Sequence, residues 1–224
     1  MISLIAFFCI LAATMAMCGV SAFKTQRDKL LIFVSVKGAA VLSLLIFAIT
    51  NANLASNMNG STLFILLALA FQIFSAVISV LPTKNDLFAP LYHSLDMLSA
   101  ASLAIAGLLL VSLSPFGLPI GFGVGLLTAL IVALVKRNFN WKVDITKYGV
   151  FIFASSLLAQ VVIILLSGLS IANIIFSVGA VVYFAYSILK TFISSENTKF
   201  VIIQNILYYL SLIILTASIF LAIY

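Results

Sequence analysis

The chain has 224 residues, of which 65% are hydrophobic and 7% are charged, and its mean hydropathy is +1.35. This balance excludes a soluble globular protein and predicts a protein that is embedded in lipid. The formal net charge of +6 would suit nucleic-acid binding, but the basic residues lie in short segments between apolar runs. Membrane topology explains them better, so we expect no nucleic-acid partner.

Eight apolar runs are each long enough for a helix that crosses a bilayer, which needs about 20 residues. They cover residues 2–23, 29–50, 62–82, 88–113, 115–136, 148–168, 170–190 and 199–223. The connections between these runs are short and leave no room for an extramembrane domain with its own core. We therefore predict an all-α fold, a bundle of eight transmembrane helices that forms a single transmembrane domain over residues 1–224.

A stripe of small residues follows the start of the fifth run, at Gly117, Gly121, Gly123 and Gly125. Small residues allow two helix backbones to approach closely in a membrane, where lipid offers no hydrophobic drive for association. Close helix packing is therefore the first interpretation of this stripe, and a groove for a substrate is the second.

The basic residues occur in every second connection between the apolar runs. Ten of the eleven follow this alternation: Lys24, Arg27, Lys29, Lys84, Lys136, Arg137, Lys142, Lys147, Lys190 and Lys199. Because basic connections stay in the cytoplasm, the pattern predicts that both termini lie on the non-cytoplasmic side.

The eleventh basic residue, Lys37, lies inside the second apolar run. A lysine at the centre of a membrane helix costs about 2.5 to 3.5 kcal/mol on insertion scales, so it needs a partner or a function. Asp96 is the one acidic residue inside an apolar run. Each lies eight residues, about 12 Å, beyond the cytoplasmic start of its helix, so the sequence predicts an ion pair between them at equal depth.

Two further polar residues accompany Asp96. His93 precedes it by three residues and so shares its helix face, and Tyr92 lies at the same level. A cation, a carboxylate and an imidazole in one cytoplasm-facing cavity would suit acid–base chemistry or an anionic head group. Two alternatives stay open: the pair fixes the helix register while His93 and Tyr92 lie at the membrane interface, or the groups line an ion or proton pathway.

No zinc-ligand spacing, phosphate-binding glycine loop or nucleophile elbow occurs in the sequence. We therefore expect no metal and no cofactor. Nothing in the sequence identifies a protein partner.

The last two runs contain the segments GAVVYFAYSILKTF, from Gly179, and NILYYLSLIIL, from Asn205, on either side of a short polar link. This order resembles the C-terminal half of the YhhN family of lysoplasmalogenase-like membrane proteins. Proteins of that family are similar in length, have eight predicted membrane helices and carry a lysine where this chain has Lys37.

The resemblance implies an integral multi-pass protein, of the bacterial inner membrane, whose partner is a membrane lipid or lysolipid. It implies hydrolysis of the vinyl-ether bond of a lysoplasmalogen, which releases a fatty aldehyde and requires an acid to protonate the enol ether. Asp96 and His93 are the catalytic candidates, from their depth and spacing. The candidate substrate-binding residues are Lys37, Tyr92, Tyr186, Tyr208 and Tyr209.

The chain departs from the family at its acidic residues. The family's Gly-Asp in the third helix corresponds to Ile78-Ser79 here, and its Ser-Asp in the seventh helix corresponds to Tyr186-Ser187. The glutamine expected after the Tyr-Tyr pair is also missing.

Two functions therefore remain open. The first is a divergent membrane lipid hydrolase in which Asp96 or His93 is the acid and Lys37 holds phosphate or tunes the carboxylate. The second is a non-catalytic lipid-binding or membrane assembly protein that has kept the scaffold without the family's acids.

Overall fold

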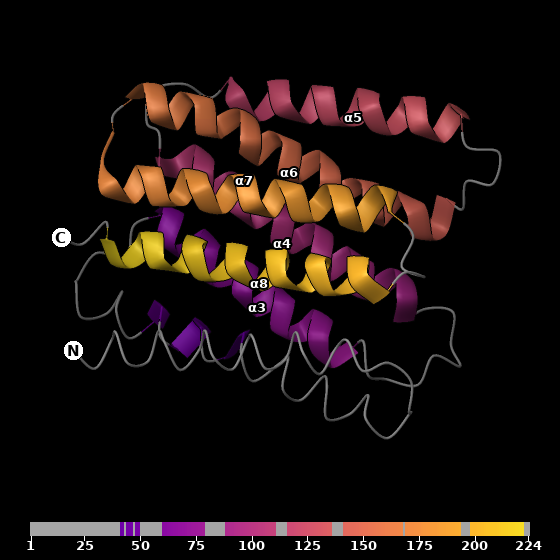
Figure 1. Ribbon diagram of the computed structural model, residues 1–224, viewed down its shortest axis with the longest axis horizontal. Helices are drawn as coiled ribbons and strands as arrows, with labels where there is room; N and C mark the ends of the chain where they lie inside the picture. The colour runs from indigo at the N-terminus through magenta and orange to yellow at the C-terminus, as the bar shows by residue number, and fades with distance from the viewer. Residues whose placement is uncertain are drawn as a thin grey trace.

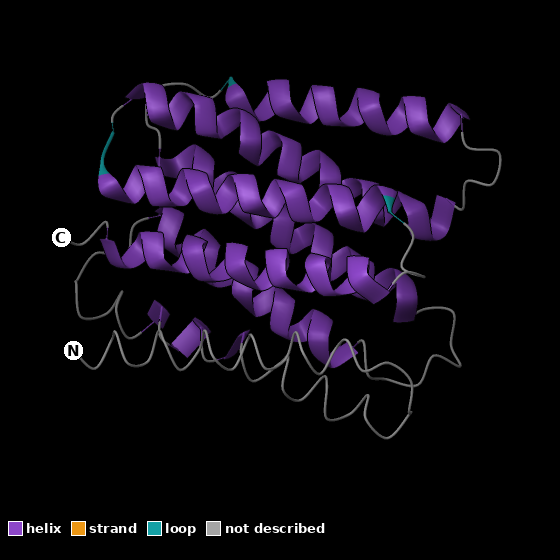
Figure 2. Ribbon diagram, in the orientation of Figure 1, coloured by secondary structure: helices purple, strands orange, loops and turns teal. Residues whose placement is uncertain are grey.

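The computed structural model describes residues 41, 42, 44–46, 48, 49, 60–78, 88–110, 116–135, 141–167, 169–193 and 198–221. All regular structure in these residues is helical (Figures 1 and 2). The helices are α3 (Gly60–Ile78), α4 (Phe88–Leu110), α5 (Gly117–Val135), α6 (Trp141–Ser167), α7 (Ile171–Phe192) and α8 (Thr198–Leu221). The described residues between 41 and 49 are also helical.

The structure confirms an all-helical fold and places a helix on each of the last six predicted spans. The first predicted span and most of the second lie outside the described residues. In the described part of the chain, three segments are long and apolar enough to cross a membrane: Leu91–Leu110, Lys147–Leu166 and Ile171–Phe192. These segments indicate a membrane protein.

One predicted boundary is clearly wrong. The helix α6 begins at Trp141, whereas the apolar run predicts a start at residue 148, so Lys142 and Lys147 belong to its first two turns and not to a connection. Hydropathy predicts which segment of the chain lies in lipid. A helix can form its backbone hydrogen bonds in a polar segment as well. The helix therefore continues beyond the apolar run.

Five of the described helices form a ring. α4 packs against α3 and α6, and α7 packs against α6 and α8, while α8 meets α3 at only a few positions. The ring closes at this last contact. α5 lies outside the ring against α6, at the upper edge of the view in Figure 1.

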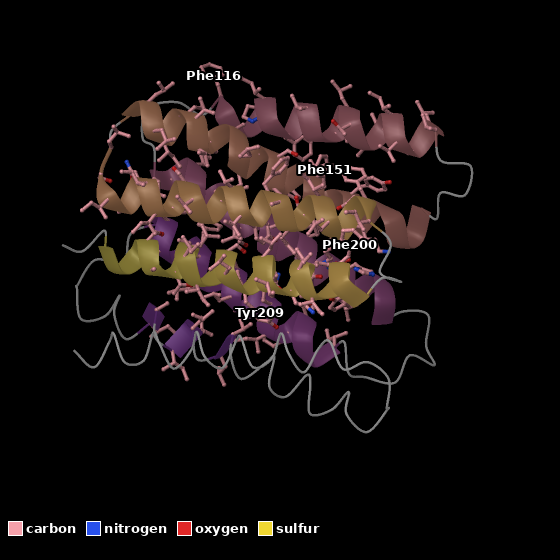
Figure 3. All side chains as sticks on the ribbon, viewed as in Figure 1. Phe116, Phe151, Phe200 and Tyr209 are labelled. Carbon is pink, nitrogen blue, oxygen red and sulfur yellow. The ribbon has the colours of Figure 1, made fainter. Side chains whose placement is uncertain are left out.

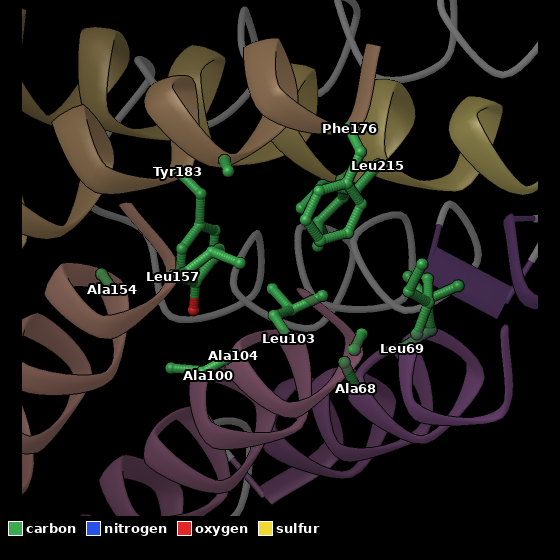
Figure 4. Packing of buried hydrophobic residues seen from close by; sticks show 14 of the residues in the cluster. Ala68, Leu69, Ala100, Leu103, Ala104, Ala154, Leu157, Phe176, Tyr183 and Leu215 are labelled. Atoms are coloured by element: carbon green, nitrogen blue, oxygen red, sulfur yellow. The ribbon is translucent and has the colours of Figure 1, made fainter. Parts of the chain in front are cut away.

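Large apolar side chains fill the interior of the ring. Phe176, Tyr183, Leu103, Leu157 and Leu215 come from four helices, and each has less than 2% of its surface exposed. Figure 4 shows these side chains converging between the helices. The outer surface is apolar as well, and Phe116, directly before α5, points away from the bundle (Figure 3). An apolar exterior around a packed apolar interior suits a lipid environment.

The small-residue stripe serves the packing of α5 on α6, as its first interpretation predicts. A Cβ atom at Gly121 would come within 2.5 Å of the backbone oxygen of Ser155, and one at Gly125 within 2.9 Å of the Cα atom of Ile152. Gly123 faces open space. The stripe therefore brings the two backbones into contact at Gly121 and Gly125.

Candidate functional site

Asp96 lies eight residues after the first residue of α4, and only 4% of its surface is exposed. One carboxylate oxygen accepts a hydrogen bond of 2.6 Å from the hydroxyl of Ser75 on α3. The other forms an ion pair with the ammonium of Lys190 on α7. Asp96 is thus buried in a helix that is long and apolar enough to cross a membrane, and its carboxylate joins three helices of the ring.

The prediction that Lys190 belongs to a cytoplasmic connection is wrong. Lys190 lies in the last turn of α7, and 8% of its side chain is exposed. Helical side chains lean toward the N-terminus of their helix, so a lysine in the last turn directs its amine back into the bundle. Lys37 lies outside the described residues, so its pairing with Asp96 stays a prediction.

Two tyrosine rings face the Lys190 ammonium. Its nitrogen lies 5.7 Å from the ring centroid of Tyr92 and 5.6 Å from that of Tyr186. At such distances a cation is attracted to the electron-rich face of an aromatic ring. The ring of His93 packs edge-on against Tyr92, with 4.9 Å between the centroids. Tyr92, Tyr186 and His93 therefore belong to the surroundings of the ion pair.

Tyrosines continue the cluster from the ion pair to α8. The ring of Tyr186 lies 5.5 Å from that of Tyr183 and 5.0 Å from that of Tyr208, and Tyr208 lies 5.0 Å from Tyr209. The hydroxyl of Tyr208 donates a hydrogen bond to the side-chain oxygen of Gln72 on α3. The structure thus brings together the substrate-binding candidates Tyr92, Tyr186, Tyr208 and Tyr209. We call this group, with Asp96, Lys190, Ser75 and Gln72, the polar centre.

The polar centre contains residues that sequence reasoning did not place there. Lys190 was assigned to a connection, although its position at the very end of an apolar run was a usable signal. Ser75 offers no comparable signal, because serines occur throughout these helices and often bond to the backbone of their own helix, as Ser155 does. Gln72 joins α3 to α8, because its side-chain oxygen accepts the hydrogen bond from Tyr208.

Gln160, a second buried glutamine, behaves differently. It is fully buried, and neither of its amide atoms has a hydrogen-bond partner in the described part of the chain. Its side chain lies against Gly117 at the other end of the bundle. Gln160 is therefore not part of the polar centre.

The described residues contain no group of three or more histidine, cysteine, aspartate or glutamate side chains that could hold a metal ion. Comparisons of the chain with protein-family models, with curated proteins and with solved structures find no match. The chemistry of the polar centre therefore carries the functional argument.

Two features decide what the polar centre can do. Asp96 accepts hydrogen bonds at both oxygens, which is the behaviour of an ionised carboxylate. Lys190 supplies a proton donor in direct contact with that carboxylate. A buried ion pair under aromatic rings can exchange its partners for the opposite charges of a ligand, or it can move a proton.

Proposed function

We propose that the protein is a multi-pass protein of a bacterial inner membrane, with eight spans and both termini on the non-cytoplasmic side. The described helices support this topology because the C-terminal end of α7 lies beside the N-terminal part of α6, where the Thr191 hydroxyl donates to the Lys147 carbonyl oxygen at 3.3 Å. Lys147 and Lys190 thus lie at one end of the bundle, which the positive-inside rule assigns to the cytoplasm.

At that end the polar centre binds the head group of a lysophospholipid, as expected for a divergent relative of the lysoplasmalogenases. The observation that carries this proposal is the buried ion pair of Lys190 and Asp96 under the rings of Tyr92 and Tyr186. Its two charges complement a zwitterionic head group, because the ammonium can hold the phosphate while the carboxylate and the rings hold the cationic end.

Hydrolysis of the bound lipid is the second candidate, and the contact between a proton donor and a carboxylate favours it. Asp96 is engaged as an acceptor, so it suits the role of a base that activates water better than the role of an acid. The Lys190 ammonium is then the proton source for the enol ether. This assignment reverses the role that the sequence suggested for Asp96.

The test uses the full chain in lipid nanodiscs, titrated with a lysophospholipid and with the matching lysoplasmalogen. We expect Lys190→Gln and Asp96→Asn each to weaken binding by about 10- to 100-fold, since a hydrogen bond to a charged group contributes about 1.5 to 3 kcal/mol. Lys147→Gln is the control, because Lys147 is a partly exposed lysine at the same end of the bundle. Equal binding by all three variants would remove the head-group proposal.

Aldehyde release from the lysoplasmalogen, measured in the same samples, separates the two candidates. Release that is lost in Lys190→Gln and Asp96→Asn supports hydrolysis at the polar centre. Binding without release assigns the protein to the non-catalytic, lipid-binding class.

A further inference from the structure

In the described part of the chain, α4 and α7 do not pack side by side. Each packs against α6, which lies between them in the ring. α4 also packs closely on α3, and α7 packs closely on α8. The ring therefore consists of two helix pairs, α3–α4 and α7–α8, that α6 joins.

At the polar centre, the two helix pairs are linked by polar contacts. Asp96 of α4 forms the ion pair with Lys190 of α7, and the Tyr92 ring of α4 lies 5.7 Å from the same ammonium. Tyr208 of α8 donates its hydrogen bond to Gln72 of α3. Charged and hydrogen-bonding groups of this kind can pair with the polar groups of a ligand instead of with each other.

Toward the other end of the bundle, α4 and α7 meet through an apolar contact. Gly107 lies eleven residues beyond Asp96 on α4, which is about 16 Å along the helix. A Cβ atom at Gly107 would come within 3.3 Å of the ring of Phe176 on α7 and within 3.2 Å of a methyl group of Leu157 on α6. Phe176 is fully buried. A polar head group has nothing to exchange for such a contact, so this end of the two helices stays packed.

The two charges of the polar centre are paired with each other, and the side chains of Lys190 and Asp96 are only 8% and 5% exposed. A head group can pair with both charges only after the two side chains separate. A buried ion pair contributes little net stability, because the cost of removing two charges from water offsets their attraction. Exchanging this pair for two new ion pairs with a ligand is therefore inexpensive.

We propose that the ion pair of Asp96 and Lys190 holds this end of the bundle closed, and that a zwitterionic head group opens it by pairing with both charges. The helix pairs α3–α4 and α7–α8 then separate at the polar centre, while Phe176 keeps α7 packed at the other end. A ligand shifts such an equilibrium only through contacts that it makes in one of the two states, and here the head group makes its charge contacts in the open state alone. The identity of the ligand rests on the head-group proposal, whereas the closing role of the ion pair does not.

The experiment measures the separation of α4 and α7 at both ends, by double electron–electron resonance between two spin labels. It uses the full chain, with its two native cysteines replaced, in phosphatidylglycerol nanodiscs. Leu91→Cys with Ile188→Cys reports on the end that holds the polar centre. Leu109→Cys with Ile174→Cys is the matched control at the other end of the same two helices. All four native side chains are exposed, so the labels do not disturb the interior.

Addition of 1-palmitoyl-lysophosphatidylcholine should lengthen the distance between positions 91 and 188 by at least about 3 Å, because one charge contact of about 2.8 Å becomes two contacts in series. The distance between positions 109 and 174 should not change. Monopalmitoylglycerol has the same alkyl chain without charges on its head group, so it should leave both distances unchanged.

Two variants test the closing role of the ion pair. Lys190→Met leaves the Asp96 carboxylate buried without its counter-ion, and access to water stabilises such a charge, so this variant should be open in the absence of the lysolipid. The double variant Asp96→Asn with Lys190→Met has neither charge. It should stay closed, and the lysolipid should not open it.

An unchanged distance between positions 91 and 188 at a lysolipid concentration that saturates binding would overturn the proposal, whatever the variants do. An equal increase at both ends would do so too, because it would mean a general loosening of the bundle. Binding itself is measured separately, by the lysophospholipid titration. If the lysolipid does not bind, the head-group proposal fails, and a closed Lys190→Met variant would then overturn the closing role of the ion pair as well.

Discussion

The side chain of Asp96 connects three helices of the ring. Ser75 reaches it from α3 and Lys190 from α7, while Asp96 itself belongs to α4. A buried charge whose partner is removed has neither water nor an opposite charge to stabilise it, which typically costs about 3 to 5 kcal/mol. The same charges removed together leave no such penalty. The pair is therefore better tested by a mutant cycle than by single substitutions.

We expect Lys190→Met to lower the free energy of unfolding by about 3 to 5 kcal/mol, because it leaves the Asp96 carboxylate buried with one partner fewer. The double variant Asp96→Asn with Lys190→Met should regain most of that loss. Denaturant unfolding in detergent micelles measures the loss of unfolding free energy in the double variant and in each single variant, Lys190→Met and Asp96→Asn. If the double variant is destabilised by the sum of the two single losses, the side chains are not coupled in the way that the structure indicates.

A second residue-scale prediction concerns the contact between α8 and α3. Tyr208→Phe keeps the ring that packs between Tyr186 and Tyr209 but removes the hydroxyl that donates to Gln72. Interhelical hydrogen bonds in membranes contribute about 0.6 to 1.7 kcal/mol, so the loss in unfolding free energy should fall in that range.

Gln72→Leu is the second single variant of a double-mutant cycle that tests this hydrogen bond. In the Gln72→Leu background the further change Tyr208→Phe should have little effect, since the hydroxyl has already lost this acceptor. An equal loss in both backgrounds would show that the bond does not contribute to stability.

At the scale of the elements, α5 is held by its glycine face on α6. The backbone oxygen and Cα atoms of α6 that approach Gly121 cannot move aside as a flexible side chain can. A methyl group there must push the two helices apart. The neighbouring Gly123 lies on the same helix and faces open space, which makes it a matched control.

We expect Gly121→Ala to destabilise the protein by about 1 to 3 kcal/mol, the usual cost of overpacking. Gly123→Ala should be neutral or should stabilise by up to about 1 kcal/mol, because alanine favours the helix without meeting another atom. Thermal unfolding in micelles compares the two variants directly. Equal midpoints for both variants would show that the two backbones do not touch at Gly121.

The elements themselves were largely predictable from the sequence. Runs of apolar residues of membrane length predicted the six helices from α3 to α8, and the glycine stripe predicted that α5 packs closely on another helix, which the structure identifies as α6. Hydropathy failed at helix ends, where Trp141 starts α6 in a polar segment and Lys190 belongs to the last turn of α7. Both errors arise because hydropathy reports suitability for lipid and not backbone conformation.

At the scale of the whole molecule, the ring decides which groups can meet. The position of Asp96 in the sequence predicted its burial and its depth in the membrane, but depth alone does not say which helices are neighbours. Both α4 and α7 pack on α6, and this arrangement lets Lys190 reach Asp96 across the ring. The tyrosines of α7 and α8 join the same centre because these two helices pack side by side. The partners in the site therefore depend on helix order, which no local pattern contains.

The proposed topology makes a parity prediction that labelling can test. The test starts from a variant without Cys9 and Cys18 and introduces a single cysteine at Asn57 or at Leu169. Four predicted spans separate these two positions, so both should lie on the non-cytoplasmic side. Each cysteine should then react with an impermeant maleimide on intact spheroplasts. Cysteines at Asn138 and Ser195, in the predicted basic connections, should react only in inside-out vesicles. Each of the four should react after the membrane is dissolved. Labelling of Asn57→Cys and Leu169→Cys from opposite sides would mean an odd number of spans between them, and the alternation of basic connections would then no longer support an eight-span bundle.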